Sequence, residues 1–478
     1  ALAGDVTVKA SRFGQGNAAG AYSLSTGDAG RVAVSGAFTV EGDFLAFGIR
    51  ALSAGARSVV SVGGPVAVTA VDPDSVAFGV RALNSGEESE VGVSGAFAVE
   101  GGRRASGIED LTAGAKSSVI VSGPITATSH DWNSEAYGIY YLAGGDGSAI
   151  AVTGAMTATG LGEDSQGHGI SYLLGGNEST ITVAGSLTAE GGFYASGAWE
   201  IGAGDDSVVK VGGDAGATAR DQAGEAYGIW YLHGGDRSAL TVTGAMSATG
   251  LGEDSQGHAV AYLYGGNDSA ITVAGDLTAE ADYYASGVFE LRTGDRSTVI
   301  VSGDVAATAR GQRSSAFGLD VIAGADSTVV VEGAVTAKGG GENRGDPFAR
   351  VVGVWGLRAS VGDGSAVAVL GPVAVTALEA DGSAGGVRIE AGTGVTATIA
   401  GPVSVRGSYV SGVVFHAGED CASDCKGTGP DPSGRGGALV ITGDVDATGK
   451  SATGVLLGGK DVALFNAATV HVQAPEGD

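Results

Sequence analysis

The chain has 478 residues, of which 88 are glycine, 9 are proline and 43% are apolar. This composition excludes a collagen-like chain and a proline-rich linker, and its apolar content is sufficient for a folded core. The formal net charge is −27, from 53 acidic and 26 basic residues, and no basic stripe indicates a nucleic-acid partner. No apolar run is long enough to span a bilayer as a helix.

The chain starts with Ala1-Leu2-Ala3-Gly4, which could follow a cleaved export signal of the Ala-x-Ala type. From there a short pattern recurs, in which two apolar residues flank one position and a glycine follows one residue later. It first appears in full as Val32-Ala33-Val34-Ser35-Gly36. Later copies end at Gly64, Gly95, Gly123, Gly154, Gly185, Gly213, Gly244, Gly275, Gly303, Gly333, Gly371, Gly401 and Gly443.

The spacing between these glycines up to Gly333 is 28, 30 or 31 residues. Each unit contains three short segments in which apolar and polar residues alternate, for example 271–273, 277–279 and 285–291. A unit of this size cannot bury its own apolar face, so it must stack on its neighbours. The pattern therefore predicts an all-β, right-handed, three-sided parallel β-helix of about 15–16 coils, as one domain over residues 1–478.

A longer repeat of 90 residues lies on top of the coil repeat. Residues 154–169 and 244–259 differ at only two of sixteen positions, which indicates that three coils were duplicated together. His168 and His258 occupy matching places in the two copies, next to acidic residues. Because the duplication explains the match without a function, we expect both histidines in a solvated loop and no acid–base site there.

The third segment of each coil carries a variable column two places after its glycine. It mixes charged and aromatic residues, which indicates a position facing solvent. An aromatic stripe on one face would suit a sugar or another protein, whereas stacking between neighbouring coils is the alternative explanation. The column contains Arg50, Arg81, Glu109, Tyr140, Ser171, Trp199, Trp230, Ala261, Phe289, Asp320, Trp355 and Arg388, and a tyrosine column beside it contains Tyr141, Tyr172, Tyr231 and Tyr262.

Two insertions interrupt the repeat, at 339–348 and 417–437. The first contains Arg344-Gly345-Asp346, a tripeptide whose guanidinium and carboxylate can contact opposite ends of a receptor cleft, although chance can also produce it. The second contains Cys421 and Cys425, the only cysteines of the chain. Their spacing favours a local disulfide that closes the loop. A redox site or a zinc site is the less favoured alternative.

The repeated coils, the export-like start and the close cysteine pair resemble the passenger domain of a Gram-negative autotransporter, the type V secretion family that includes pertactin-like and antigen-43-like adhesins. The resemblance covers essentially the whole chain. It implies an adhesin on the bacterial outer membrane or in secreted form, which binds host cells, a surface glycan or copies of itself on neighbouring cells. The family's membrane β-barrel is missing after Pro475, and we expect the native reading frame to continue into it.

The expected function is binding without catalysis, since the nucleophile motif of serine-protease autotransporters is absent. The candidate binding residues are Arg344, Gly345 and Asp346 with the aromatic set Tyr140, Trp199, Trp230, Phe289 and Trp355, and no cofactor or metal is expected. Aspartate turns such as 144–148 resemble calcium-binding repeats, but they recur only once per coil and do not by themselves imply calcium. The alternatives are a structural spacer or coat, and a β-helical polysaccharide lyase or hydrolase.

Overall fold

The computed structural model describes residues 4–9, 16–70, 72–341, 353–418, 436–459 and 462–474. All regular elements in these ranges are β-strands. The described residues contain no helix that is long and apolar enough to cross a membrane. The chain divides into two compact units, unit 1 (Ala1–Gly235 with Gly250–Gly252) and unit 2 (Asp236–Thr249 with Glu253–Asp478). Whether the units form the single domain that the repeat predicts stays a prediction.

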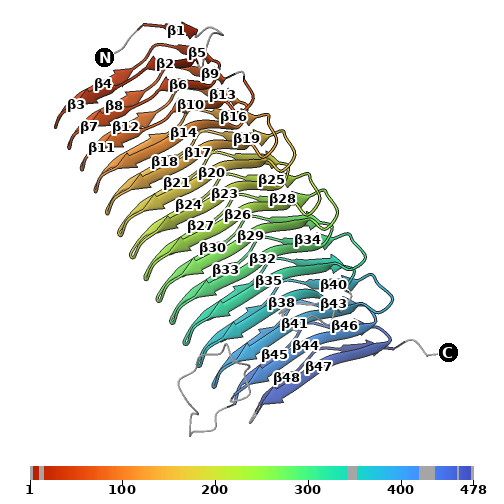
Figure 1. Ribbon diagram of the computed structural model, residues 1–478. Coiled ribbons are helices and arrows are strands. Elements are labelled where there is room, and N and C mark those ends of the chain that lie inside the picture. The colour runs from red at the N-terminus through yellow and green to blue at the C-terminus, as the bar shows by residue number, and fades with distance from the viewer. Residues whose placement is uncertain are drawn as a thin grey trace. The chain divides into compact units, whose positions relative to one another are not determined.

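Each coil of unit 1 contributes strands to three parallel sheets, which we call sheets A, B and C. In Figure 1 the strands of this unit run from red through yellow to green, in successive layers. Sheet A contains β4 (Arg31–Val34), β8 (Val59–Val62), β12 (Glu90–Val93), β15 (Ser118–Val121), β18 (Ala149–Val152), β21 (Thr180–Val183) and β24 (Val208–Val211). Sheet B contains β1 (Val6–Lys9), β5 (Phe38–Gly42), β9 (Val66–Ala70), β13 (Phe97–Gly101), β16 (Ile125–Ser129), β19 (Met156–Gly160), β22 (Leu187–Gly191) and β25 (Ala215–Ala219). Sheet C contains β2 (Asn17–Ala21), β3 (Leu24–Thr26), β6 (Leu45–Ile49), β7 (Leu52–Ala54), β10 (Val76–Val80), β11 (Leu83–Ser85), β14 (Arg104–Ala113), β17 (Glu135–Gly144), β20 (Gln166–Gly175), β23 (Tyr194–Ala203) and β26 (Glu225–Gly234).

Unit 2 has the same three parallel sheets. Its sheet A contains β27 (Ala239–Val242), β30 (Ala270–Val273), β33 (Thr298–Val301), β36 (Thr328–Val331), β39 (Ala366–Val369), β42 (Thr396–Ile399), β45 (Ala438–Ile441) and β48 (Ala463–Asn466). Its sheet B contains β28 (Met246–Gly250), β31 (Leu277–Ala281), β34 (Val305–Ala309), β37 (Val335–Gly339), β40 (Val373–Ala377), β43 (Val403–Arg406), β46 (Val445–Thr448) and β49 (Val470–Gln473). Its sheet C contains β29 (Gln256–Gly265), β32 (Tyr284–Thr293), β35 (Ser315–Ala323), β38 (Val354–Val361), β41 (Ser383–Ala391), β44 (Tyr409–Ala417) and β47 (Ser451–Gly459).

The alternating segments form these strands because every second side chain enters the core. In β8, Val60 and Val62 are buried while Ser61 between them is partly exposed. Val60 pairs with Val91 of the next coil, so like residues stack into apolar ladders. The predicted all-β, parallel, three-sheet β-solenoid is confirmed, and its right-handed winding stays a prediction.

The glycine that ends the repeated pattern lies where successive coils are closest. A Cβ atom built on Gly64 would collide with the carbonyl oxygen of Gly36, and one on Gly95 would collide with that of Gly64. No other residue type fits such a contact without moving the backbone. The glycine of the motif is therefore required by packing between coils.

The loop between sheets B and C is either long or short along unit 1, and two long loops meet across a short one. An Asp131 carboxylate oxygen accepts a hydrogen bond from the backbone amide of Asp74, 57 residues earlier, at 2.7 Å. Asp221 accepts in the same way from the amide of Asp164, also 57 residues earlier, at 2.9 Å. Each bond passes over one intervening coil and joins two loops that are not neighbours in the stack.

Candidate functional site

Sheet C positions two columns of side chains on the outer side of unit 1. In β17, Ala136, Ile139 and Leu142 point into the core and are fully buried, while Tyr137 and Tyr140 lie on the opposite side. The first outer column consists, in each coil, of the residue just before the glycine that corresponds to Gly138. The second outer column consists of the residue two places after that glycine. The first contains Phe47, Phe78, Ser106, Tyr137, His168, Ser196 and Tyr227, and the second contains Arg50, Arg81, Glu109, Tyr140, Ser171, Trp199 and Trp230.

The rings of these columns form a continuous aromatic ladder in unit 1. Tyr137 stacks on His168 at 5.4 Å between centroids and meets Tyr140 edge-on at 4.9 Å. Trp199 contacts His168 edge-on at 5.6 Å and stacks on Trp230 at 5.1 Å. Tyr140, Trp199 and Trp230 stay partly exposed. The stacking between coils is thus present, and one side of the ladder remains accessible.

Phe289 has the same surroundings in unit 2. Its ring meets those of His258 at 5.6 Å and Tyr262 at 5.5 Å, and it lies 6.0 Å from that of Tyr284. Tyr284 in turn stacks on Phe317 at 5.6 Å. Four of the five predicted aromatic residues therefore lie in the predicted column, on the outer side of sheet C.

The prediction for Trp355 is wrong in register. Trp355 pairs with Phe317 and Gly385, whereas Arg358 pairs with Asp320 and Arg388. The glycine of this coil that corresponds to the others is Gly356, not Gly353, so Trp355 belongs to the first outer column. The ten-residue insertion before it shifted the alignment. The expected exposure of the second column is also wrong at Ser171 and Ala261, which are buried.

His168 and His258 do not lie in solvated loops. They are in β20 and β29, where they are 4% and 5% exposed, and each Nδ1 lies 2.7 Å from a serine hydroxyl, of Ser196 and Ser286. Burial lowers the pKa of His168 to about 4 and that of His258 to about 3, because the charged ring loses its hydration. The expectation of solvation failed because the glycine-rich sequence around them continues as a strand.

An arginine and two glutamates lie beside the N-terminal part of the ladder. Arg104 donates a hydrogen bond to Glu109 at 2.8 Å and pairs with Glu135 at 3.4 Å. Its guanidinium also lies 4.8 Å from the centre of the Tyr137 ring and 4.5 Å from that of Tyr140. Burial raises the pKa of Glu109 above its ordinary value, against the opposing charge of Arg104. One buried carboxylate oxygen of Glu109, Oε2, has no hydrogen-bond partner.

A hollow of about 480 Å³ opens next to this cluster, on the outer side of sheet C in unit 1. It is lined by Arg50, Ala51, Arg81, Ala82, Glu109, Asp110, Tyr140 and Tyr141. Arg50 lies 4.2 Å from the ring centre of Tyr22 and 5.9 Å from that of Phe47, and Arg81 lies 5.6 Å from the ring centre of Phe47. The hollow thus joins cationic, acidic and aromatic groups over four successive coils.

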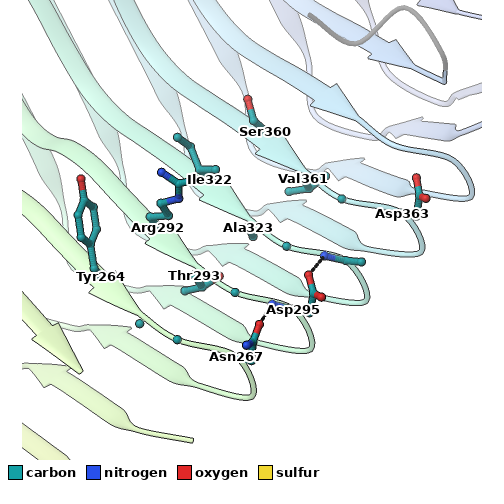
Figure 2. Close-up of a pocket in the computed structure, with 16 residues that line it drawn as sticks. Tyr264, Asn267, Arg292, Thr293, Asp295, Ile322, Ala323, Ser360, Val361 and Asp363 are labelled. Atoms are coloured by element: carbon teal, nitrogen blue, oxygen red, sulfur yellow. Dashed lines mark hydrogen bonds between the residues drawn. The ribbon is translucent and has the colours of Figure 1, made fainter. Parts of the chain in front are cut away.

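Unit 2 has a hollow of about 540 Å³ along the turns that follow sheet C, lined among others by Tyr264, Arg292, Ile322 and Ser360 (Figure 2). The side chains of several polar turn residues accept hydrogen bonds from backbone amides. Asn267 Oδ1 accepts from the amide of Asp295 at 2.9 Å, and Asp295 Oδ1 accepts from the amide of Ala325 at 2.9 Å, as the dashed lines show. Asp363 similarly accepts from the amide of Thr393 at 2.7 Å.

The remaining predictions concern residues that the structure does not describe or a group that it does not form. Arg344, Gly345 and Asp346 lie outside the described residues, as do Cys421, Cys425 and most of both insertions. In the described ranges, no three histidine, cysteine or acidic side chains gather in a way that could hold a metal ion. The Asp146 oxygen Oδ1 of one calcium-like turn accepts from the amide of Asn177 at 2.8 Å.

The sequence did not single out the hollow of unit 1. The sequence predicts that Arg50, Arg81 and Glu109 share one column. It does not predict that Arg104 pairs with Glu109, which leaves Arg50 and Arg81 without a carboxylate partner in the described ranges. No family model, curated protein or solved structure matches this chain.

Proposed function

We propose that this chain is an adhesin of the autotransporter passenger type, which binds through the outer face of sheet C. The observation that carries the proposal is the continuous aromatic ladder of unit 1, from Tyr137 and Tyr140 to Trp230, which keeps one side partly exposed. Its partner would be a host-cell receptor, a surface glycan or the same protein on a neighbouring cell. A location at the surface of a Gram-negative bacterium belongs to the same proposal.

Physical reasons support a binding face here. Rings of tryptophan and tyrosine offer a large apolar contact area together with a polar edge, and they are enriched where proteins bind other molecules. A spacer needs only the inward ladders of valine, isoleucine and leucine, because these hold the coils together. Outward tryptophans in two successive coils therefore favour the adhesin over the spacer.

The test replaces exposed rings on one sheet and exposed apolar residues on another. The variant Tyr140→Ser/Trp199→Ser/Trp230→Ser should lose most adhesion of protein-coated beads to epithelial cells and most aggregation between beads. Ile120→Ser/Val208→Ser is the matched control, since these side chains are exposed on the outer side of sheet A in the same unit. Circular dichroism and urea unfolding should show that both variants are folded.

Equal adhesion by the ring variant and the native chain would contradict the proposal and favour the spacer. The variant Tyr140→Phe/Trp199→Phe/Trp230→Phe keeps rings in place and should keep most binding. Asp346→Glu tests the predicted tripeptide separately. If only Asp346→Glu abolishes adhesion, the binding site is the insertion and not sheet C.

A glycan-cleaving enzyme is the second candidate, and Glu109 favours it. This carboxyl group lines the hollow, its pKa is raised by burial, and Asp110 and two tyrosines lie beside it. Two carboxyl groups that line one hollow are the kind of arrangement that glycoside hydrolysis requires. Incubation with polysaccharides and a reducing-end assay tests this, and a signal that Glu109→Gln removes would establish the enzyme.

A further inference from the structure

We propose that the hollow formed by Arg50, Arg81, Glu109, Asp110, Tyr140 and Tyr141 binds the acidic groups of an anionic polysaccharide. This inference rests on the proposed adhesive function and names the ligand class for its binding face. The guanidinium groups would bind the carboxylates or sulfates, and the tyrosine rings would contact the sugar rings.

Arg50 and Arg81 lie next to each other without a carboxylate partner among the described residues. Arg50 and Arg81 occupy the same position in adjacent coils, since Ile49 pairs with Val80, so their backbones lie about 4.8 Å apart. Like charges at this spacing repel each other. Neither guanidinium forms an ion pair with a carboxylate in the described structure, although acidic residues outnumber basic ones two to one. An anion between them would remove the repulsion.

Other arginines on the same sheet have carboxylate partners. Arg104, one coil further on, is held between Glu109 and Glu135. In unit 2, Arg358 and Arg388 are also paired in register, but Arg358 contacts Asp320 at 3.7 Å and Arg388 pairs with Glu390. Arg50 and Arg81 instead contact only the rings of Tyr22 and Phe47, which support the guanidinium planes and leave their N–H edges available.

The groups around the two arginines indicate which kind of anion the hollow would bind. Tyr140 and Tyr141 line the same hollow, and the ladder continues from Tyr140 to Tyr172 at 5.9 Å in the next coil. Glu109 and Asp110 also line the hollow, and Arg104 already pairs with Glu109. Rings and cations along one stack of coils match a linear chain that repeats sugar rings and acidic groups. An acidic peptide would use only the cations.

The test measures binding of the full chain to polygalacturonate and to its methyl ester by biolayer interferometry at low ionic strength. Both polymers have the same sugar rings, but the ester has lost its charge. Dextran sulfate and dextran form the corresponding sulfate pair, and poly-glutamate is the acidic peptide. We expect binding to a charged glycan, at least tenfold weaker binding to its neutral partner and to poly-glutamate, and a decrease in affinity with salt.

Arg50→Gln/Arg81→Gln should weaken this binding at least tenfold. Arg57→Gln/Arg406→Gln is the control, because it changes net charge equally at exposed sites outside the hollow, and its affinity should stay within twofold. Equal binding to charged and neutral polymers, equal binding to poly-glutamate, no binding to any anionic glycan, or unchanged affinity of Arg50→Gln/Arg81→Gln would each overturn the inference.

The result is separable from the test of the proposed function. If the ring variant loses cell adhesion while Arg50→Gln/Arg81→Gln retains glycan binding, the adhesin stands and the acidic ligand at this hollow fails. If the arginine variant loses glycan binding but the ring variant still adheres to cells, the anionic site exists and the aromatic adhesin fails. Release of reducing ends during the measurement would assign the hollow to an enzyme.

Discussion

The two hollows described above differ in the charged groups that line them. In unit 2, the side chains of Asn267, Asp295 and Asp363 each accept a hydrogen bond from a backbone amide of the following coil, while Thr293 Oγ1 in the same lining has no partner in the described structure. In unit 1, Arg50 and Arg81 contact rings only, and Glu109 keeps an oxygen without a partner. The smaller hollow is therefore the better candidate site because two cations lie in register in adjacent coils without a carboxylate partner in the part of the chain that the structure describes.

The largest effect should come from the ring beneath the two arginines. Phe47 is 6% exposed and stacks on Phe78 at 5.6 Å, so Phe47→Ala should lower the free energy of unfolding by about 3 kcal/mol. It should also remove binding of anionic glycan. Phe317→Ala in unit 2, at 3% exposure, should lower stability similarly without changing glycan binding. Urea unfolding and biolayer interferometry measure both; equal loss of binding in the two variants would contradict the comparison.

The matched histidines should make both units sensitive to acid. The pKa of each ring is near its usual 6.5 in the unfolded chain but about 4 for His168 and about 3 for His258 in the folded chain. Protons thus bind the unfolded chain more strongly, so stability is complete above pH 6.5 and falls as the pH drops toward 4. The loss should reach on the order of 2–3 kcal/mol per histidine.

His168→Gln/His258→Gln provides the comparison for this acid response. Glutamine can still hydrogen-bond the facing serine hydroxyl but does not take up a proton. Urea midpoints measured from pH 7.5 to 4.5 should decrease less for this variant than for the native chain. Parallel curves would show that the two rings do not cause the acid response.

A smaller effect is expected from the turns of the unit 2 hollow. Asp295→Ala leaves the amide of Ala325 without its acceptor and should lower the free energy of unfolding by about 1 kcal/mol. Asp295→Asn keeps an accepting oxygen and should be close to native. Neither variant should change glycan affinity, and a change in affinity would show that this hollow also binds the polymer.

The smallest effect should follow from the exposed ion pair of Arg296 and Asp268, at 2.7 Å in unit 2. Both side chains are largely in water, so salt screens their attraction. Arg296→Gln should leave the urea midpoint almost unchanged, and 0.5 M NaCl, roughly three times a physiological concentration, should not widen the difference. A clear loss of stability at low salt alone would assign this pair a structural role.

Much of the fold was predictable because it depends on periodicity. Val60, Val62 and Gly64 show the pattern directly, and the structure places them in a buried ladder and at a corner without room for a Cβ. The column of Tyr140, Trp199, Trp230 and Phe289 followed from counting after each glycine. The same counting failed at Trp355, where an insertion left two glycines, Gly353 and Gly356, to choose between.

The chemistry of the site was less predictable because it depends on contacts between coils. His168 looks like a loop residue among glycines and acids, but its burial is decided by the strands on either side. Arg50 and Arg104 are the same residue type on the same sheet. Of the two, only Arg104 forms ion pairs within the described residues, with Glu109 in its own strand and Glu135 in the next coil. Pairing of this kind needs three-dimensional neighbours.

The hydrogen bonds that pass over a shorter coil have a consequence for how such a protein can change its length. Asp131 and Asp74, or Asp221 and Asp164, each tie a long loop to another long loop with a short one between them. Loss of a coil with a short loop would bring two long loops together and leave these carboxylates without their amides. Gain or loss of a whole group of three coils keeps a short loop between the two long loops that are joined. The 90-residue duplication is therefore a step that lengthens the scaffold without breaking its own loop contacts.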